Sequence, residues 1–548
     1  MKSLRRLPLA LLPLTLAVAA HCGGGADRAS GDPTPAPRGD SPSVGGTDAD
    51  AGAIARGDAA TPPPKPQHAC AVGPDDNATV AVCTKSAPAG SFTPRVKWKW
   101  STKGGSITTP LVGHFVDTNA DGKVDLCDTP NVLALAAPNP GSPGAKGTFV
   151  VLAGDTGAPL RTFATNVDAN ISPAFGDLDG DGLSDIVAVD LSGRLVALSH
   201  EGAVKWTTTN PIGVHAVNAS QCAAIAIYDL DADGSPEIIV GFEVFDAKGA
   251  RLFGVPGDHG DLPQGMFWCP TPTAADLDGD GKLEVIFGRE TYHHDGSLYW
   301  TTSEHPGQPH VADLDGDGAP DVLIATDTGV SLYAANGTKK FGPVRPTQQV
   351  IDARCWGKPG AIHDFDGDGK PDFAMGSCAD YSVYGVTAAG LTAKWSKPIS
   401  DPSGLATGTG FDFLGRGVAD AMYADETTAY VFDGRLGTEE MRASRTSQTL
   451  VEYPVVADVD DDGSADVIVV SNGSGVVDAV TVYEDVQRRW IPARRVWNQE
   501  AYHVTNVRED GTIPRVMAKS WQKLNTFRTN AQIEGSGECA PPPPPPPK

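Results

Sequence analysis

One nine-residue pattern constrains this chain more than any other feature: acids at positions 1, 3, 5 and 9, with glycine at position 6. Eight segments carry the pattern or a degraded form of it, and they begin at Asp117, Asp177, Asp229, Asp276, Asp313, Asp364, Asp412 and Asp458. Successive starts lie 60, 52, 47, 37, 51, 48 and 46 residues apart. A mean spacing of about 49 residues is typical of one four-stranded blade of a β-propeller.

The sequences that flank the pattern predict strands. A β-branched run such as Ile186–Val189 or Val467–Val470 follows most segments. A glycine turn and a strand with a large aromatic residue come next, as at Trp206, Phe253 and Trp300. We therefore expect an all-β fold, a seven- or eight-bladed β-propeller over residues 93–485. Two segments could supply the outer strand of the last blade, Arg95–Trp98 or Gln487–Trp490.

The residue types of the pattern predict a cage of oxygen ligands for a hard cation. Ca²⁺ suits such a cage better than Mg²⁺, and the carbonyl at position 7 would add a ligand. An EF-hand is excluded, because position 12 is apolar, as at Ala188 and Val240, and the flanks are strands. Acidic β-turns without an ion are the alternative, which the sevenfold repetition disfavours.

About seven calcium ions follow from the intact loops. The predicted ligands are Asp117, Asn119, Asp121, Lys123 and Asp125; Asp177, Asp179, Asp181, Leu183 and Asp185; Asp229, Asp231, Asp233, Ser235 and Glu237; Asp276, Asp278, Asp280, Lys282 and Glu284; Asp313, Asp315, Asp317, Ala319 and Asp321; Asp364, Asp366, Asp368, Lys370 and Asp372; and Asp458, Asp460, Asp462, Ser464 and Asp466. The seventh segment has Leu414 and Arg416 at positions 3 and 5, so it is expected to bind no metal.

Set between apolar strands at this period, the loops resemble FG-GAP repeats of the VCBS type, the family of the integrin α-subunit propeller and of many bacterial surface proteins. The resemblance implies a ring of blades with Ca²⁺ in the loop between the first two strands of each blade. It also implies extracellular recognition of a protein or glycan ligand on a face of the propeller.

The overall charge argues against nucleic acid as a partner. The 548 residues include 43 Lys plus Arg and 68 Asp plus Glu, a formal net charge of −25. The seven intact loops hold 27 of these acids, so the rest of the chain is nearly neutral. The acidity therefore indicates capacity for cations concentrated in one repeated loop.

The N-terminus predicts export. Lys2, Arg5 and Arg6 precede an apolar run that is too short to span a bilayer comfortably. Residues 1–22 resemble a lipoprotein signal with Cys22 as the lipidated residue, which would anchor an exported protein at the outer membrane or cell surface. A secretory peptide cut near Ala20 is the alternative, and membrane contact is expected only through the anchor.

The remaining segments are short. Residues 23–66 predict a disordered tether, 67–92 a short Cys-containing segment, 486–535 a C-terminal cap, and 536–548 a polyproline tail. The cap contains Trp490, Trp497, Tyr502 and His503, which could pack against the ring or form a ligand site.

Nine cysteines are present, and eight remain once Cys22 is set aside. An even number without a CxxC motif favours disulfides in an oxidising compartment. Nearest-neighbour pairing would join Cys70 to Cys83 and Cys355 to Cys378.

Catalytic motifs such as GxSxG, HExxH and a phosphate-binding glycine loop are missing from the sequence. We expect a non-catalytic adhesion or recognition module. The alternatives are an exported carbohydrate-active enzyme, lyase-like, that uses His and Tyr in the propeller channel, and a structural spacer in an envelope assembly. His114 and His310 share one repeat phase and are the candidates for lining the channel.

Overall fold

The structure is a computed structural model that describes residues 69–73, 81–88, 90–213, 222–255, 269–345, 355, 357–387, 390–402, 405–450, 452–535 and 537–542. The chain divides into Met1–Pro62 and Pro63–Lys548, and the second unit contains all described residues. The predicted signal segment, Cys22 and the tether lie outside them. In the described ranges, no helix has both the length and the apolarity that crossing a bilayer requires.

Nearly all regular structure in the second unit is β, in small antiparallel sheets that we number in chain order. Sheet 1 comprises β3 (Leu111–Gly113), β4 (Asn131–Ala136), β5 (Lys146–Ala153) and β6 (Pro159–Asp168); sheet 2 comprises β8 (Ala174–Gly176), β9 (Asp185–Val189), β10 (Leu195–Leu198) and β11 (Val204–Thr207); sheet 3 comprises β12 (Ala223–Tyr228), β13 (Glu237–Val240), β14 (Glu243–Phe245) and β15 (Arg251–Gly254), with β7 (Ile171–Ser172) added in parallel to β12; sheet 4 comprises β16 (Thr273–Ala275), β17 (Glu284–Ile286), β18 (Glu290–Tyr292) and β19 (Leu298–Thr301).

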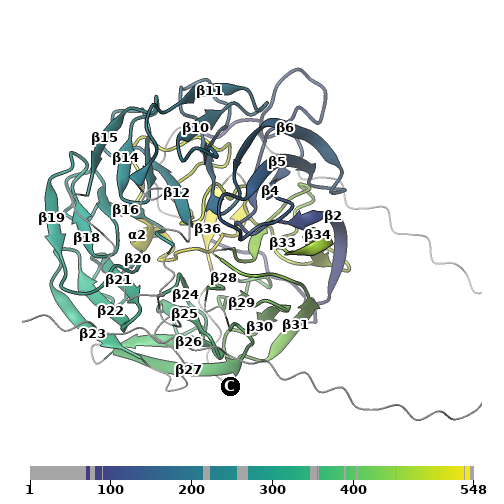
Figure 1. Ribbon diagram of the computed structural model, residues 1–548. Helices are drawn as coiled ribbons and strands as arrows, with labels where there is room; N and C mark the ends of the chain where they lie inside the picture. Colours follow the sequence, from purple (N-terminus) through teal and green to yellow (C-terminus); the bar gives the residue numbers. More distant parts are fainter. Residues whose placement is uncertain are drawn as a thin grey trace, which may run out of the picture. The chain divides into compact units, whose positions relative to one another are not determined.

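The second half of the unit repeats this arrangement. Sheet 5 comprises β20 (Gln308–Ala312), β21 (Asp321–Thr326), β22 (Gly329–Ala334) and β23 (Lys339–Val344); sheet 6 comprises β24 (Ala361–His363), β25 (Asp372–Ser377), β26 (Asp380–Thr387) and β27 (Gly390–Pro398); sheet 7 comprises β28 (Gly408–Phe411), β29 (Asp420–Ala424), β30 (Thr428–Phe432) and β31 (Glu439–Ser444); sheet 8 comprises β32 (Val455–Ala457), β33 (Asp466–Val470), β34 (Asn472–Asp485) and β2 (Pro94–Gly105). The sheets follow one another around a common centre (Figure 1).

The β-branched runs form the second strand of each sheet and are buried on both faces. Ile186–Val189 and Ile238–Val240, for example, are at most 1% exposed. Apolar clusters join each sheet to its neighbour, so every inner strand is covered on both sides. Burial on both faces explains why these runs are continuously apolar instead of alternating.

Sheet 8 is completed by the N-terminal strand β2. Over most of its length β2 pairs antiparallel with β34, from Pro94 opposite Asp485 to Gly105 opposite Asn472. Of the two segments that could supply this outer strand, the structure therefore uses Arg95–Trp98, while Gln487–Trp490 lies beyond the end of β34. The first and last parts of the repeat region are thereby held in one sheet.

A large residue on the outer strand packs on the glycine turn of the next sheet. Trp98 of sheet 8 donates its Nε1–H to the Gly154 carbonyl of sheet 1 at 2.6 Å, and Trp206 of sheet 2 donates to Ala247 of sheet 3 at 2.9 Å. A Cβ on Gly157, whose φ is +68°, would lie 2.3 Å from the Trp98 ring. The glycine turn and the aromatic residue of the sequence pattern are thus the two halves of one contact between sheets.

The centre is filled by the C-terminal segment, residues 490–532, which we call the plug (yellow in Figure 1). The plug contacts the first strand of every sheet, or a residue beside that strand. Seven contacts are hydrogen bonds, which join Trp497 to Val112, Asn498 to Phe175, Gln499 to Ile227, Asn525 to Asp313, Phe527 to Ile362, Arg528 to Thr409 and Asn530 to Val456. The eighth is an ion pair between Lys519 and Asp276. The short helix α2 (Ser520–Lys523) belongs to the plug. The plug therefore ties all eight sheets together.

The disulfides correct one predicted pairing. Cys355 bonds Cys378 as expected, but Cys70 bonds Cys127, so the predicted pair of Cys70 with Cys83 is wrong. Cys83 instead bonds Cys539, where β1 (Ala81–Val82) pairs with β36 (Gly537–Ala540), which also pairs with β35 (Ile533–Glu534). Cys222 bonds Cys269. Nearest-neighbour pairing failed for Cys83 because the two ends of the folded unit meet in space.

We expect Trp98→Ala to lower the free energy of unfolding by about 3 kcal/mol or more, because it removes a buried aromatic ring from the contact between sheets 8 and 1. Val96→Ala on the same strand is the control, since Val96 is 43% exposed and should cost less than about 0.5 kcal/mol. Urea unfolding followed by far-ultraviolet circular dichroism, which does not rely on tryptophan fluorescence, measures the free energy of unfolding of both variants. Equal costs for the two variants would contradict the inferred role of Trp98.

Candidate metal centres

Each predicted metal loop connects the first and second strands of its sheet. The second loop, for example, runs from Asp177, just after β8, to Asp185 at the start of β9. The same placement holds for all eight segments, so the loops occupy equivalent positions around the unit. This is the location that the family resemblance implied.

Backbone hydrogen bonds shape every loop around its first acid. Asp177 accepts hydrogen bonds from the N–H groups of Gly180 at 2.8 Å, Asp181 at 3.2 Å and Gly182 at 2.9 Å. Position 6 is left-handed, with φ of +82° at Gly182, which is why glycine recurs there. The loop therefore wraps its backbone around one carboxylate.

The acids at positions 5 and 9 are held in the same way. The position-5 carboxylate accepts the N–H of position 7, as Asp181 does from Leu183 at 2.8 Å. The position-9 carboxylate accepts the N–H of position 2, as Glu237 does from Leu230 at 2.8 Å. One oxygen of the position-9 acid is thereby used by the backbone, which fixes the direction of the other.

The donor set fits calcium. Carboxylate oxygens of Asp177, Asp179 and Asp185 lie within 4.8 Å of one another, as do those of Asp229, Asp231 and Glu237. Two oxygens that share one Ca²⁺ at about 2.3–2.6 Å can be no more than roughly 5 Å apart, so these clusters have the required size. Asp460 Oδ1 is buried and makes no hydrogen bond to the described part of the chain. A bound cation would supply that missing partner.

Burial raises the pKa of the enclosed acids. The pKa of Glu237 rises to about 8, chiefly through burial, with further contributions from Asp231, Asp229 and Asp233. The pKa of Asp372 also rises to about 8, and that of Asp458 rises well above its ordinary value, for the same leading reason. Burial thus favours the protonated form of Glu237 and Asp372 near neutral pH.

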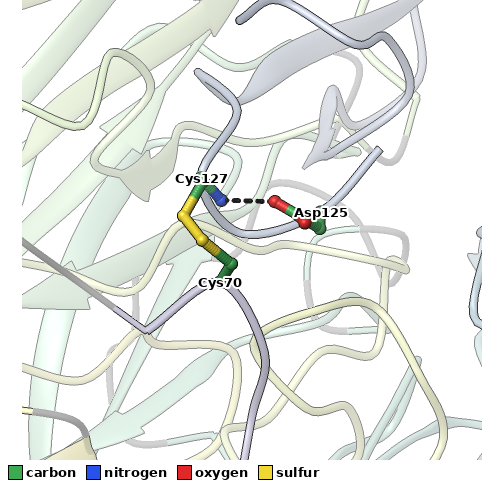
Figure 2. A group of neighbouring side chains, drawn as sticks. All are labelled: Cys70, Asp125 and Cys127. Carbon is green, nitrogen blue, oxygen red and sulfur yellow. Dashed lines mark hydrogen bonds between the residues drawn. A yellow bond between two sulfur atoms is a disulfide. The ribbon is translucent and has the colours of Figure 1, made fainter. Parts of the chain in front are cut away.

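The first loop departs from the predicted ligand set. Asp128 accepts the N–H groups of Thr118 at 2.6 Å and Asn119 at 3.1 Å, which is the role of the position-9 acid in the other loops. Asp128 is 1% exposed, whereas the Asp125 carboxylate accepts the N–H of Cys127 (Figure 2). The structure thus places Asp128, and not Asp125, where the ninth residue of the pattern belongs.

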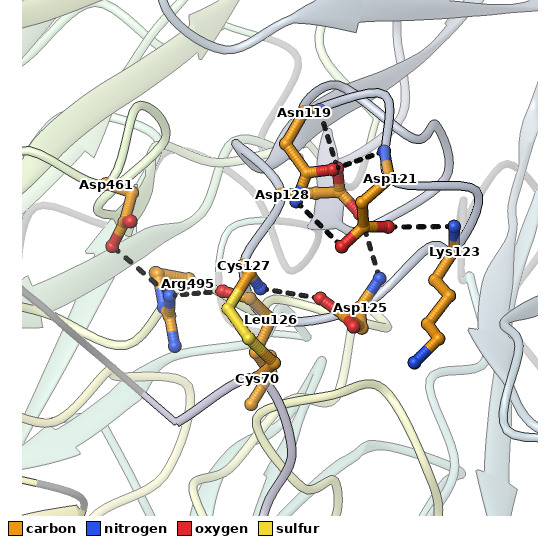
Figure 3. Close-up of a disulfide and its surroundings, with 10 residues drawn as sticks. All are labelled: Cys70, Asn119, Asp121, Lys123, Asp125, Leu126, Cys127, Asp128, Asp461 and Arg495. Atoms are coloured by element: carbon orange, nitrogen blue, oxygen red, sulfur yellow. Dashed lines mark hydrogen bonds and ion pairs between the residues drawn. A yellow bond between two sulfur atoms is a disulfide. The ribbon is translucent and has the colours of Figure 1, made fainter.

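A disulfide and an arginine hold the segment between Asp125 and Asp128. Cys127 is bonded to Cys70 (Figure 3). The neighbouring Leu126 carbonyl accepts a hydrogen bond from Arg495 at 3.0 Å, and Arg495 also pairs with Asp461 at 3.2 Å. The chain makes an extra turn between Asp125 and Asp128. Because both sulfurs are oxidised, the group of Cys70, Asp125 and Cys127 offers no thiolate to a metal.

The seventh loop keeps its shape although it lacks two ligands. Asp412 still accepts the N–H of Gly417, and Gly417 keeps a left-handed φ of +72°. The Arg416 guanidinium lies 3.6 Å from Asp420 and supplies positive charge where the other loops have an acid. The backbone of the loop therefore does not depend on the acids at positions 3 and 5.

The two histidines that were candidates for lining a channel, His114 and His310, are both buried. Both ring nitrogens of His114 are buried, with no hydrogen-bond partner among the described residues, and burial lowers its pKa to about 4. His310 is fully buried against Phe527 of the plug, and its Nε2 accepts the N–H of Gly360 at 2.7 Å. His114 lines a small cavity together with Asp125, Ser184 and Asp510, whereas His310 is enclosed by its neighbours.

The aromatic and cationic residues of the plug also satisfy one another. Arg494 donates to the carbonyls of Val504 and Val507 and pairs with Glu509 at 3.0 Å. Trp497 stacks on Tyr502 with ring centres 4.2 Å apart, and both are fully buried. These groups hold the plug in place instead of forming an open ligand site.

Comparison with known proteins agrees with this architecture. Residues 145–240 and 313–375 match the FG-GAP-like repeat. The chain contains FG-GAP-like repeats. Its fold is similar to that of the V. cholerae biofilm matrix protein Bap1, with a TM-score of 0.66 and 21% identity over 81% of this chain and 99% of that one.

Weaker structural similarity extends to two lyases. Rhamnogalacturonan lyase YesW has a TM-score of 0.49 and 17% identity, over 86% of this chain and 83% of its own. The Bacillus licheniformis rhamnogalacturonan lyase PL11 has a TM-score of 0.47 and 18% identity, over 84% and 83%. No curated protein matches the sequence significantly.

Replacing Asp128 or Asp125 singly by asparagine tests which of the two acids of the first loop is the metal ligand. Asp128→Asn should remove one bound Ca²⁺ per chain, because it deletes the charge that replaces the ninth ligand while retaining a hydrogen-bond acceptor. Asp125→Asn is the matched control and should leave the number unchanged. Equilibrium dialysis with radioactive calcium gives both numbers. If only Asp125→Asn loses an ion, Asp125 is the ligand, as the spacing predicted, and the assignment to Asp128 is wrong.

Proposed function

We propose that this chain forms an eight-bladed β-propeller stabilised by Ca²⁺. Eight sheets with one common strand order support the count, and β2 completes the eighth. In the seven intact loops, the ligands would be the acids at positions 1, 3, 5 and 9 with the carbonyl at position 7, except that Asp128 replaces Asp125. Bound calcium would neutralise mutually repelling carboxylates and so hold the two inner strands of each blade together.

We further propose that the propeller is a recognition module that binds an extracellular protein or a glycan and performs no catalysis. The filled centre is the observation that carries this proposal. The plug contacts the whole ring, and the buried Arg528 and Glu500 pair at 3.0 Å inside it. Because the plug occupies the centre of the described residues, we assign binding to the surfaces of the blades.

We propose that the protein acts outside the cytoplasm, held by a lipid on Cys22. Four disulfides support an oxidising compartment. The acidic net charge argues against nucleic acid and against a basic surface for anionic lipids. Labelling with a radioactive fatty acid tests the anchor, which Cys22→Ser should abolish.

Calcium removal should destabilise the fold. If each site has a dissociation constant near ~10⁻⁴ M, 1 mM calcium stabilises the native state by about 1.4 kcal/mol per site. Thermal melts with EDTA should therefore show a marked fall in Tm, reversed by added calcium. A Tm that changes with neither EDTA nor calcium would refute the assignment of the loops as calcium sites.

The same melts should depend on pH in a defined direction. In EDTA, buried acids such as Glu237 and Asp372 keep protons that the unfolded chain releases, so stability should fall as the pH rises from about 5 to 8. In calcium this fall should disappear, because the ion replaces the protons.

A panel of polysaccharides and host or biofilm matrix proteins tests the recognition role. Binding by surface plasmon resonance without release of unsaturated oligosaccharides is the expected result. Calcium-dependent cleavage of a polysaccharide would overturn it in favour of a lyase.

A further inference from the structure

Every sheet has a one-residue β-bulge on its outer strand, just before or near the large residue that packs on the next sheet. Each pairing of the third strand with the outer strand skips one residue at this point. The skipped residues are Leu160, Lys205, Leu252, Tyr299, Lys340, Lys394, Glu440 and Lys97, in the order of the sheets. A bulge redirects the side chain of its extra residue.

Where the bulged residue is lysine, its ammonium group lies among the acids of the loop in the same sheet. Lys205 Nζ is 2.6 Å from Asp179 and 2.7 Å from Asp185, the acids at positions 3 and 9. Lys340 Nζ repeats this in sheet 5, at 2.6 Å from Asp315 and 2.5 Å from Asp321. The ammonium therefore bridges the two acids between which a metal would lie.

The other two lysines make the same bridge. Lys97 Nζ lies 2.6 Å from Asp460 and 3.1 Å from Asp466, and its side chain is only 6% exposed. Lys394 pairs with Asp366 and lies 4.0 Å from Asp372 in sheet 6, so its bridge to the position-9 acid is longer. Four loops thus carry a positive charge built into their own sheet.

The remaining sheets lack a bulged lysine. Sheets 1 and 3 have Leu160 and Leu252, and no ion pair reaches the four acids of the third loop from any residue that the structure describes. In sheet 4 the bulged Tyr299 packs on His293, whose Nδ1 is 3.0 Å from Glu284, while Lys519 lies 3.1 Å from Asp276. These three loops have no outer-strand ammonium.

In sheet 7, both the residue at position 5 of the loop and the bulged residue carry the opposite charge to their counterparts in the lysine-containing sheets. Its loop carries Arg416 at position 5, and its bulged residue is the acid Glu440, on which the charge of Arg416 acts. In this sheet, the charges at position 5 of the loop and at the bulge are therefore both opposite to those in sheets 2, 5, 6 and 8.

We propose that the bulged residue of the outer strand decides how strongly each loop binds calcium. A bulged lysine neutralises its loop and competes with the ion, so the second, fifth, sixth and eighth loops bind weakly. The first, third and fourth loops, without that lysine, form the tight class. This inference rests on the proposed calcium-binding function, and it divides the seven sites instead of treating them as equal.

The test uses the oxidised full-length mature protein and calcium alone, with the number and affinity of bound ions measured by titration calorimetry and equilibrium dialysis. The wild type should show about three tight sites and a second class with affinity about tenfold or more lower, because calcium must break two or three ion pairs there. Lys340→Met should add one tight site. Leu252→Lys should remove one.

Lys339→Met is the matched control, since Lys339 precedes Lys340 on the same strand but pairs with Glu304 outside the loop. It should leave the sites unchanged. Lys205→Met provides a second test if Lys340→Met fails to fold, and circular dichroism in 10 mM calcium checks folding.

The outcomes separate the two proposals. Absence of calcium binding by the wild type refutes the metal-binding function itself. Seven equal sites, or site numbers in Lys340→Met and Leu252→Lys that match the control, refute the role of the bulge while leaving calcium binding in place.

Discussion

Repulsion among the acids of one repeated loop is the constraint on which the rest of this structure depends. In every sheet but the seventh, three or four carboxylates lie in the loop between the first two strands, and like charges at such distances need positive charge beside them. The protein supplies part of that charge through backbone N–H groups, through lysines on outer-strand bulges and, in one loop, through Arg416. The proposed calcium ions would supply the remainder.

The contacts that join the last sheet to the first are of a different kind from those within the loops. Sheets are joined by outer-strand rings that pack on glycine turns, and the same contact joins sheet 8 to sheet 1 through Trp98 and Gly157. The plug then fills the space that eight inner strands leave. Its buried pairs, such as Arg528 with Glu500, are costly to desolvate, so each charge requires its partner to be in place, and this favours one arrangement of the segment.

The sequence predicted the local features well because they depend on neighbouring residues. The loops, the strands that follow them and the glycine turns were all placed by spacing and residue type. Prediction was less successful where the pattern is interrupted or distant segments meet. Asp128 lies three residues outside the pattern yet binds the backbone of the loop, and the neighbouring Cys127 is bonded to Cys70. The lysines at the bulges were visible in the sequence, before the large residue of the outer strand, but their approach to the acids was not.

By itself, the sequence determined the repeat, the chemistry of the loops and the all-β class, since each is encoded within about fifty contiguous residues. Only the tertiary structure decided which terminus completes the last sheet, how six of the eight cysteines pair, and what fills the centre. Those outcomes depend on contacts between residues up to 456 positions apart, whose formation is governed by packing and loop closure and leaves no periodic signal in the chain.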